Sequence, residues 1–153
     1  MNNQETAEVA FKAFQKAIND NLIKTEAGAI HKDLRVHMDR PEGQIRFTYA
    51  LMATGTRIKA SCVAVNTEPY KEKPCFDVGV TTFKKFRGQG FAQEVLAKSI
   101  DEMKQGCVRN GISEFYLELK VDKDNVASHS LCKKIADEII DNGTSTTYMK
   151  HVR

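Results

Sequence analysis

The chain has 153 residues, which is enough for one domain with a substantial core and short for two. The net charge is +3, and the basic residues are interspersed with acidic ones. This pattern disfavours the clustered basic surface of a nucleic-acid binder. No apolar run approaches the roughly 20 residues of a membrane-spanning helix, and no secretory signal pattern is visible. We therefore expect a single cytoplasmic domain over residues 1–153, with no nucleic-acid or membrane partner.

Cysteine usage agrees with a reducing compartment. The four cysteines are scattered without a C-x-x-C pair, so free thiols are expected and a metal site is not. Three of them alternate with apolar residues or belong to an apolar stripe, which is typical of core positions: Cys62, Cys75 and Cys107.

The N-terminal half predicts a helix followed by antiparallel strands. Phe11, Phe14, Ile18 and Leu22 recur at helical spacing, and the helix is expected to end at Asp20–Asn21. A second short helix is a weaker prediction for residues 25–32. Alternating apolar residues predict strands at 34–39, 44–52 and 57–65, the last two forming a hairpin around "ATGT".

A polar loop over residues 66–74 is expected to lead to a strand at 75–83. Gly79, inside that strand, predicts a bulge or the close approach of another backbone. An apolar stripe then predicts a helix from Phe91 to Asn110, ended by Asn110–Gly111.

A strand at 114–121 and a short helix at 126–135, capped by Asp124 or Asn125, come next. The chain closes with a hairpin around residues 141–143. The strand–helix–strand passages require at least one parallel pair within an otherwise antiparallel sheet, so the fold class is α+β, or mixed α/β.

The junction "FKKFRGQGFA" places two glycines and an arginine where a helix begins. The first N–H groups of a helix lack intrahelical partners and carry partial positive charge. Gly88 and Gly90 would let a ligand approach these groups closely, and Arg87 adds a full charge, which predicts a site for a diphosphate-like anion. The same residues also fit a tight turn with a solvated basic rim. Neither a P-loop nor a dinucleotide fingerprint is present.

Two motifs together resemble the acyl-CoA-binding segment of the GNAT superfamily of N-acetyltransferases. The first is R/Q-x-x-G-x-G/A at a helix start, which Arg87 to Ala92 fit. The second is an Asn after the next strand, with a small residue three positions later and Leu six positions later; Asn125, Ser128 and Leu131 fit it. The resemblance covers about residues 76–153 and, more loosely, the hairpin 44–65.

This resemblance implies a GNAT-like domain, with a mostly antiparallel twisted sheet, one parallel pair splayed at the acyl-CoA site, and flanking helices. It implies acetyl transfer from acetyl-CoA to a primary amine of an unidentified small molecule, peptide or protein. Pyrophosphate would bind the N–H groups at the helix start, and pantetheine would extend along the strand edge. The implied cofactor-binding residues are Val78, Val80, Thr81, Thr82, Arg87, Gly88, Gln89, Gly90, Phe91, Ala92, Asn125 and Ser128.

The implied chemistry needs a neutral amine, a polarised thioester carbonyl and a proton for the leaving thiolate. A backbone N–H near Val80 could stabilise the oxyanion, and Asp77 or Glu118 could be the general base, although each also suits an ordinary strand surface. Many family members have a tyrosine seven residues after the Asn as general acid. Here that residue is Cys132, which could donate a proton or simply pack, and Tyr148 is an alternative acid.

The chain departs from the family pattern in three places. Besides Cys132, it has Lys134-Ile135-Ala136-Asp137 where Lys-x-Gly-Phe is common, and a helix where the family usually begins with a strand. His129 is expected on the surface. The acceptor and the formation of a homodimer stay open, and an acyl-CoA-binding module without catalysis is the alternative function.

Overall fold

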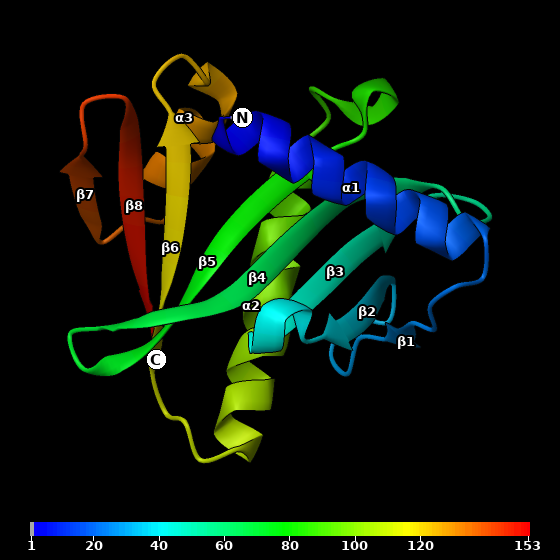
Figure 1. The fold of residues 1–153 in the computed structure, drawn as a ribbon, viewed down its shortest axis with the longest axis horizontal. Helices are drawn as coiled ribbons and strands as arrows, with labels where there is room; N and C mark the ends of the chain where they lie inside the picture. The colour runs from blue at the N-terminus through cyan, green and yellow to red at the C-terminus, as the bar shows by residue number, and fades with distance from the viewer. Residues whose placement is uncertain (1) are drawn as a thin grey trace.

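One eight-stranded sheet, in the order β1-β2-β3-β4-β5-β6-β8-β7, organises the chain (Figure 1). The structure is a computed structural model and describes residues 2–153. All neighbouring strands are antiparallel except β5 and β6, which run parallel, as the strand–helix–strand pattern predicts. The elements in chain order are α1 (Asn3–Asn19), β1 (Glu26–Ala27), β2 (Leu34–Asp39), η1 (Pro41–Gly43), β3 (Arg46–Met52), β4 (Ile58–Tyr70), β5 (Lys73–Thr82), η2 (Lys84–Phe86), α2 (Phe91–Arg109), β6 (Phe115–Asp122), α3 (Val126–Lys133), β7 (Glu138–Asp141) and β8 (Ser145–Val152).

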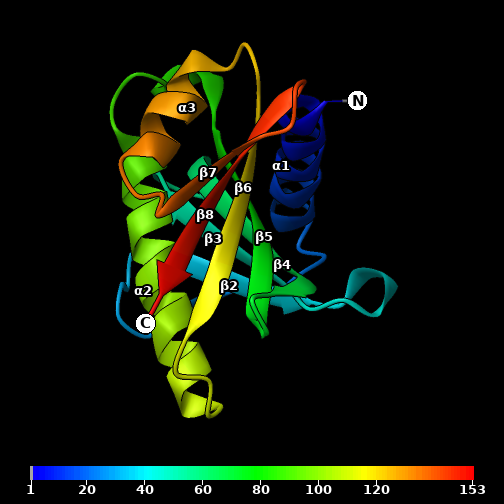
Figure 2. The same cartoon turned by 90° about the vertical axis from the view of Figure 1, so that its left-hand side faces the viewer.

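The helices cover both faces of the sheet: α1 lies on one face, and α2 and α3 lie on the other (Figure 2). The main core is on the α2 face, where the alternating apolar residues of the strands meet the stripe of α2 that includes Val95, Leu96 and Met103. A smaller core on the opposite face joins Phe11 of α1 to Ala50 and Ile58. Cys62 and Cys75 are buried and Cys107 packs against the core, as expected.

Most predicted elements are confirmed. The first helix ends at Asn19, with Asp20 as its C-cap, and α2 ends at Arg109, followed by Asn110 and Gly111. The strand 34–39, the hairpin of β3 and β4, and the closing hairpin of β7 and β8 also form. Asn125 caps α3 by accepting the N–H of Ser128 at 3.2 Å.

The structure corrects four details. Leu22 lies beyond the helix and is 74% exposed. Residues 25–32 form no helix; they contain the short β1 and a loop. Residues 66–74 are not a loop, because β4 continues to Tyr70 and β5 begins at Lys73, around a two-residue turn whose φ angles are both positive. Gly79 pairs regularly with Val63, so it is not a bulge.

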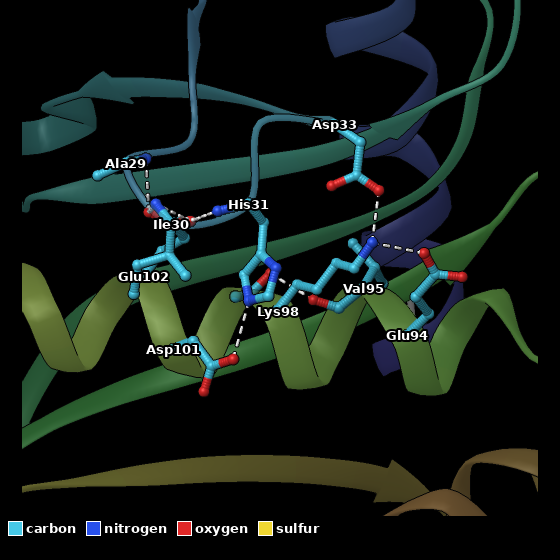
Figure 3. Close-up of polar contacts among 10 residues, drawn as sticks. Ala29, Ile30, His31, Asp33, Glu94, Val95, Lys98, Asp101 and Glu102 are labelled. Atoms are coloured by element: carbon cyan, nitrogen blue, oxygen red, sulfur yellow. Dashed lines mark hydrogen bonds and ion pairs between the residues drawn. The ribbon is translucent and has the colours of Figure 1, made fainter.

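The loop after β1 is tied to α2 by a buried carboxylate (Figure 3). Glu102 accepts the backbone N–H groups of Ala29, at 2.8 Å, and of Ile30 and His31, at 3.0 and 2.7 Å. Gly28 lies so close to this carboxylate that a Cβ there would be 2.7 Å from Glu102 Oε2 and 2.4 Å from the His31 carbonyl oxygen. A helix over residues 25–32 would use these N–H groups internally, and Glu102 provides the competing partner.

Among residues 2–153, no helix is long and apolar enough to cross a membrane.

Candidate active site

The parallel pair β5–β6 comes apart after three residues. Cys75 to Asp77 pair with Tyr116 to Glu118, and no pairing continues beyond the Asp77–Glu118 rung, although both strands run on for several residues. A cavity of about 370 Å³ occupies the widening gap and extends to the start of α2. Strand edges that face such a gap carry backbone groups available to a third extended chain.

The start of α2 supplies a cluster of unpaired donors at one end of the cavity. Gly88 and Gly90 both have left-handed backbones, with φ of 76° and 84°, which explains why glycine stands at both positions. The first intrahelical bond is donated by Glu94 to the Gly90 carbonyl, so the N–H groups from Gly88 to Gln93 have no backbone partner within residues 2–153. Together with the helix dipole and Arg87, they form a cationic concavity that suits a diphosphate.

The structure brings the predicted cofactor-binding residues to this one cavity, with one exception. Gln89 does not line it, and its side-chain amide instead donates to the Lys85 carbonyl at 3.4 Å. The residues that do line it are Val78, Val80, Thr81, Thr82, Arg87, Gly88, Gly90, Phe91, Ala92, Asn125 and Ser128. They come from β5, the junction, α2 and α3, so the two sequence motifs converge in space.

The two candidate bases lie side by side at the last paired rung. Asp77 and Glu118 are register partners on the α1 face of the sheet, and Lys120, which lines the cavity, lies beyond them. Burial raises the pKa of Asp77, an effect that Lys120 opposes and Glu118 reinforces. Glu118 forms an ion pair with Lys120 at 3.2 Å. Burial therefore makes Asp77 easier to protonate than an exposed aspartate, and neither Asp77 nor Glu118 is among the residues that line the cavity.

Cys132 and Tyr148 lie on the opposite side of the sheet from the carboxylates. Cys132 lines the cavity and is 2% exposed, and burial raises the pKa of its thiol to about 11, so it is protonated at neutral pH. Tyr148 does not line the cavity; it is 1% exposed, and burial raises its pKa. The thiol is thus the nearer of the two proton sources to the gap.

His129 is not a surface residue, contrary to expectation. It is half-buried, with its Nδ1 2.7 Å from the Tyr148 hydroxyl and its Nε2 2.9 Å from the Asp122 carbonyl oxygen. Since a carbonyl only accepts, Nε2 carries the proton, and in the neutral ring Nδ1 accepts from Tyr148. The tyrosine proton is therefore engaged by His129 rather than directed at the cavity.

Sequence reasoning missed one wall of the cavity altogether. Asn3, Gln4, Ala7 and Glu8 of α1 line it, because α1 crosses the face of the sheet above the gap (Figure 1). The Asp122 carboxylate holds this end of α1 by accepting the N–H groups of Asn3 and Gln4, at 3.2 and 3.0 Å. No local pattern signals a contact between residues more than a hundred positions apart.

Arg87 is itself held by this wall. Its guanidinium donates to Glu8 Oε1 at 2.9 Å. The arginine is thereby fixed beside the unpaired N–H groups by a residue of α1, although both partners keep substantial exposure to water.

Solved structures share this arrangement of strands and helices. An acetyltransferase of the GNAT family from Streptococcus pneumoniae is 16% identical, with a TM-score of 0.52, over 74% of this chain and 69% of that one. RimL, a ribosomal L7/L12 α-N-protein acetyltransferase solved with coenzyme A, is 17% identical, with a TM-score of 0.51, over 70% and 62%. The chain has the GNAT fold.

A third similar structure is yncA, a putative acetyltransferase from Salmonella typhimurium solved with acetyl-CoA. It is 14% identical, with a TM-score of 0.50, over 72% of this chain and 65% of that one. The chain thus spans roughly two thirds of the length of the three proteins. At the level of sequence, no protein-family model matches it and no curated protein was found to match.

Proposed function

We propose that the protein is an N-acetyltransferase that transfers the acetyl group of acetyl-CoA to a primary amine. The observation that carries this proposal is the gap between β5 and β6, which ends at a row of unpaired helix N–H groups. An extended pantetheine fits the first feature and a pyrophosphate fits the second. The GNAT fold supports the proposal, since RimL and yncA were solved with coenzyme A and acetyl-CoA.

The chain's own residues suggest how the reaction proceeds. The Asp77 carboxylate, on the side of α1, takes a proton from the incoming ammonium, directly or through water. The neutral nitrogen then attacks the thioester carbon, and a backbone N–H of β5 near Val80 stabilises the oxyanion. A C–N bond forms and the C–S bond breaks. The leaving thiolate takes a proton from water or from the Cys132 thiol on the other side of the gap, and Cys132 would then regain its proton from solvent.

Ligand-induced stabilisation tests the binding half of this proposal. Acetyl-CoA should raise the melting temperature of the wild-type protein by mass action. In Gly90→Phe, the new side chain would project where the phosphates should bind, so the shift should disappear. Gly43→Phe is the matched control, because Gly43 also has a left-handed backbone, with φ of 82°, but lies far along the chain at η1.

The Gly43→Phe control distinguishes a loss of acetyl-CoA binding from a general loss of stability. Gly43→Phe carries the same backbone strain, and it should lower the melting temperature yet keep the acetyl-CoA shift. Equal shifts in the two variants, or no shift of the wild-type protein at millimolar acetyl-CoA, would contradict the proposed site.

Thiol release separates an enzyme from a catalytically silent acyl-CoA-binding module. The enzyme should release free CoA thiol from acetyl-CoA in the presence of an amine panel, at a rate that depends on amine concentration. A protein stabilised by acetyl-CoA that releases no thiol with any amine would be the silent module.

A further inference from the structure

A second hollow lies on the other flank of α1, between the helix and strands β2, β3 and β4. Its volume is about 170 Å³. Three small residues, Ala10, Ala13 and Ala17, line its helix side, and the sheet supplies the floor. Since an α-helix presents positions three and four residues apart on one face, the alanines leave a trough along this flank of α1. We call this hollow the α1 groove.

Two hydroxyl-bearing residues lie on the floor of the α1 groove. Thr48 and Ser61 line the groove and are only 4% and 3% exposed, yet neither hydroxyl forms a side-chain hydrogen bond within residues 2–153. Every fully enclosed polar side-chain atom in that range has a partner. The two hydroxyls therefore open into the groove. Hydroxyls that open into the groove can hydrogen-bond to water or to a molecule bound there.

An ion pair lies at the outer end of the α1 groove. Asp39 and Arg46 are register partners at the ends of β2 and β3, joined by two hydrogen bonds of 2.8 and 2.5 Å. The Arg46 guanidinium holds the pKa of Asp39 below its usual range, so this carboxylate stays paired and ionised. The remaining walls are mainly apolar, with Phe11 and Phe14 among them.

The inner end of the α1 groove lies one strand away from the cavity beside β5. Val63 lines the groove, and its register partner Gly79 lines the acyl-CoA cavity. Asp77 lines neither hollow; it lies two residues from Gly79 on the same face, which makes it a diagonal neighbour of Val63, at about 7–8 Å. An amine could therefore approach Asp77 while the rest of its molecule occupies the groove.

From this geometry we infer that the α1 groove binds the acceptor, and that the acceptor is a small amine with one apolar group of side-chain size. The inference rests on the proposed transferase function. The groove volume is well below the roughly 300–1,000 Å³ of drug-sized sites, so it admits one aromatic or branched aliphatic group. The Thr48 and Ser61 hydroxyls offer the acceptor a polar contact beside that group. Polyamines and aminoglycosides have no such group, and the paired Asp39 offers them no free carboxylate.

Acceptor kinetics with a groove-filling variant test this inference. The wild-type protein should acetylate 2-phenylethylamine or isoamylamine with a lower KM than spermidine, tobramycin or a peptide with a free N-terminus. Ala10→Leu fills the groove and should raise the KM for 2-phenylethylamine at least ten-fold. Val9→Leu is the matched control, because Val9 is 54% exposed on the same helix and does not line the groove; it should leave KM unchanged.

A second readout keeps failure of the inference distinct from failure of the proposed function. Acetyl-CoA should stabilise Ala10→Leu as much as wild type, because that residue lies outside the cofactor cavity. 2-Phenylethylamine, titrated alone and followed by protein NMR, should shift resonances of Thr48 and Ser61 in wild type and not in Ala10→Leu. Equal KM values in Ala10→Leu and wild type, a preference for spermidine, tobramycin or the peptide, or amine-induced shifts away from the groove would each overturn the inference.

Discussion

Asp77 is the residue whose environment says most about chemistry. Burial raises the pKa of its carboxyl group above the usual 3.8, and no side chain within the described residues donates it a hydrogen bond. A carboxylate with these properties is costly to keep charged in the folded protein. The raised pKa brings it closer to the operating pH, where a general base is most effective.

The Asp77→Asn variant tests the role of this carboxylate in the reaction. If Asp77 is the base, the variant should lose about 100-fold or more in kcat/KM, and the acidic limb of the pH–rate profile should disappear with it. Glu118→Gln is the control for the neighbouring carboxylate and should keep that limb. A Glu118→Gln profile that lacks the limb, with the Asp77→Asn profile unchanged, would assign the base to Glu118.

The sign of the stability change also follows from the raised pKa. Between the unfolded and the folded pKa of Asp77, the folded state binds more protons, so stability falls as pH rises through that window. Asp77→Asn should therefore melt at a higher temperature than wild type at pH 7, and the difference should shrink below pH 4.

At the scale of elements, the segment between β1 and β2 shows how a local prediction is overridden. Residues 25–32 were expected to be helical, yet their backbone N–H groups donate to Glu102 of α2 (Figure 3). The same segment is held further by His31 to Asp101 and by Asp33 to Lys98. Lys98 also pairs with Glu94 at 2.7 Å, one turn earlier in α2.

Glu102→Gln should loosen this segment. An amide places its NH₂ group against N–H donors where the carboxylate had an acceptor, so the free energy of unfolding should fall by about 2 kcal/mol. The adjacent Asp101→Asn makes the same chemical change at an exposed contact to the same segment, and it should cost less than about 0.5 kcal/mol. Urea denaturation measures both, and equal losses would contradict a special role for Glu102.

Periodic patterns predicted the elements well where one face of an element is buried. The stripe of α2 and the alternation in β3 and β6 identify the same core residues that the structure buries. The pattern failed at residues 66–74, where β4 and β5 extend beyond the core. Glu68 and Glu72 are exposed there, so the sequence carries no apolar alternation even though the backbone pairs.

At the scale of the whole molecule, α1 divides the candidate site into two compartments. Its first turns wall the cavity between β5 and β6, and its later turns wall the α1 groove. Most residues that line the first compartment could be predicted from sequence because two motifs carry several of them. The role of α1 could not, since it depends on contacts such as Asn3 to Asp122 that join distant parts of the chain.

A crystal structure with acetyl-CoA tests the central claim most directly. The account predicts that the pyrophosphate accepts hydrogen bonds from N–H groups between Gly88 and Gln93, and that the pantetheine lies between β5 and β6 with the thioester near Asp77. Acetyl-CoA bound elsewhere on the protein, or a thioester directed away from the α1 face of the sheet, would contradict it.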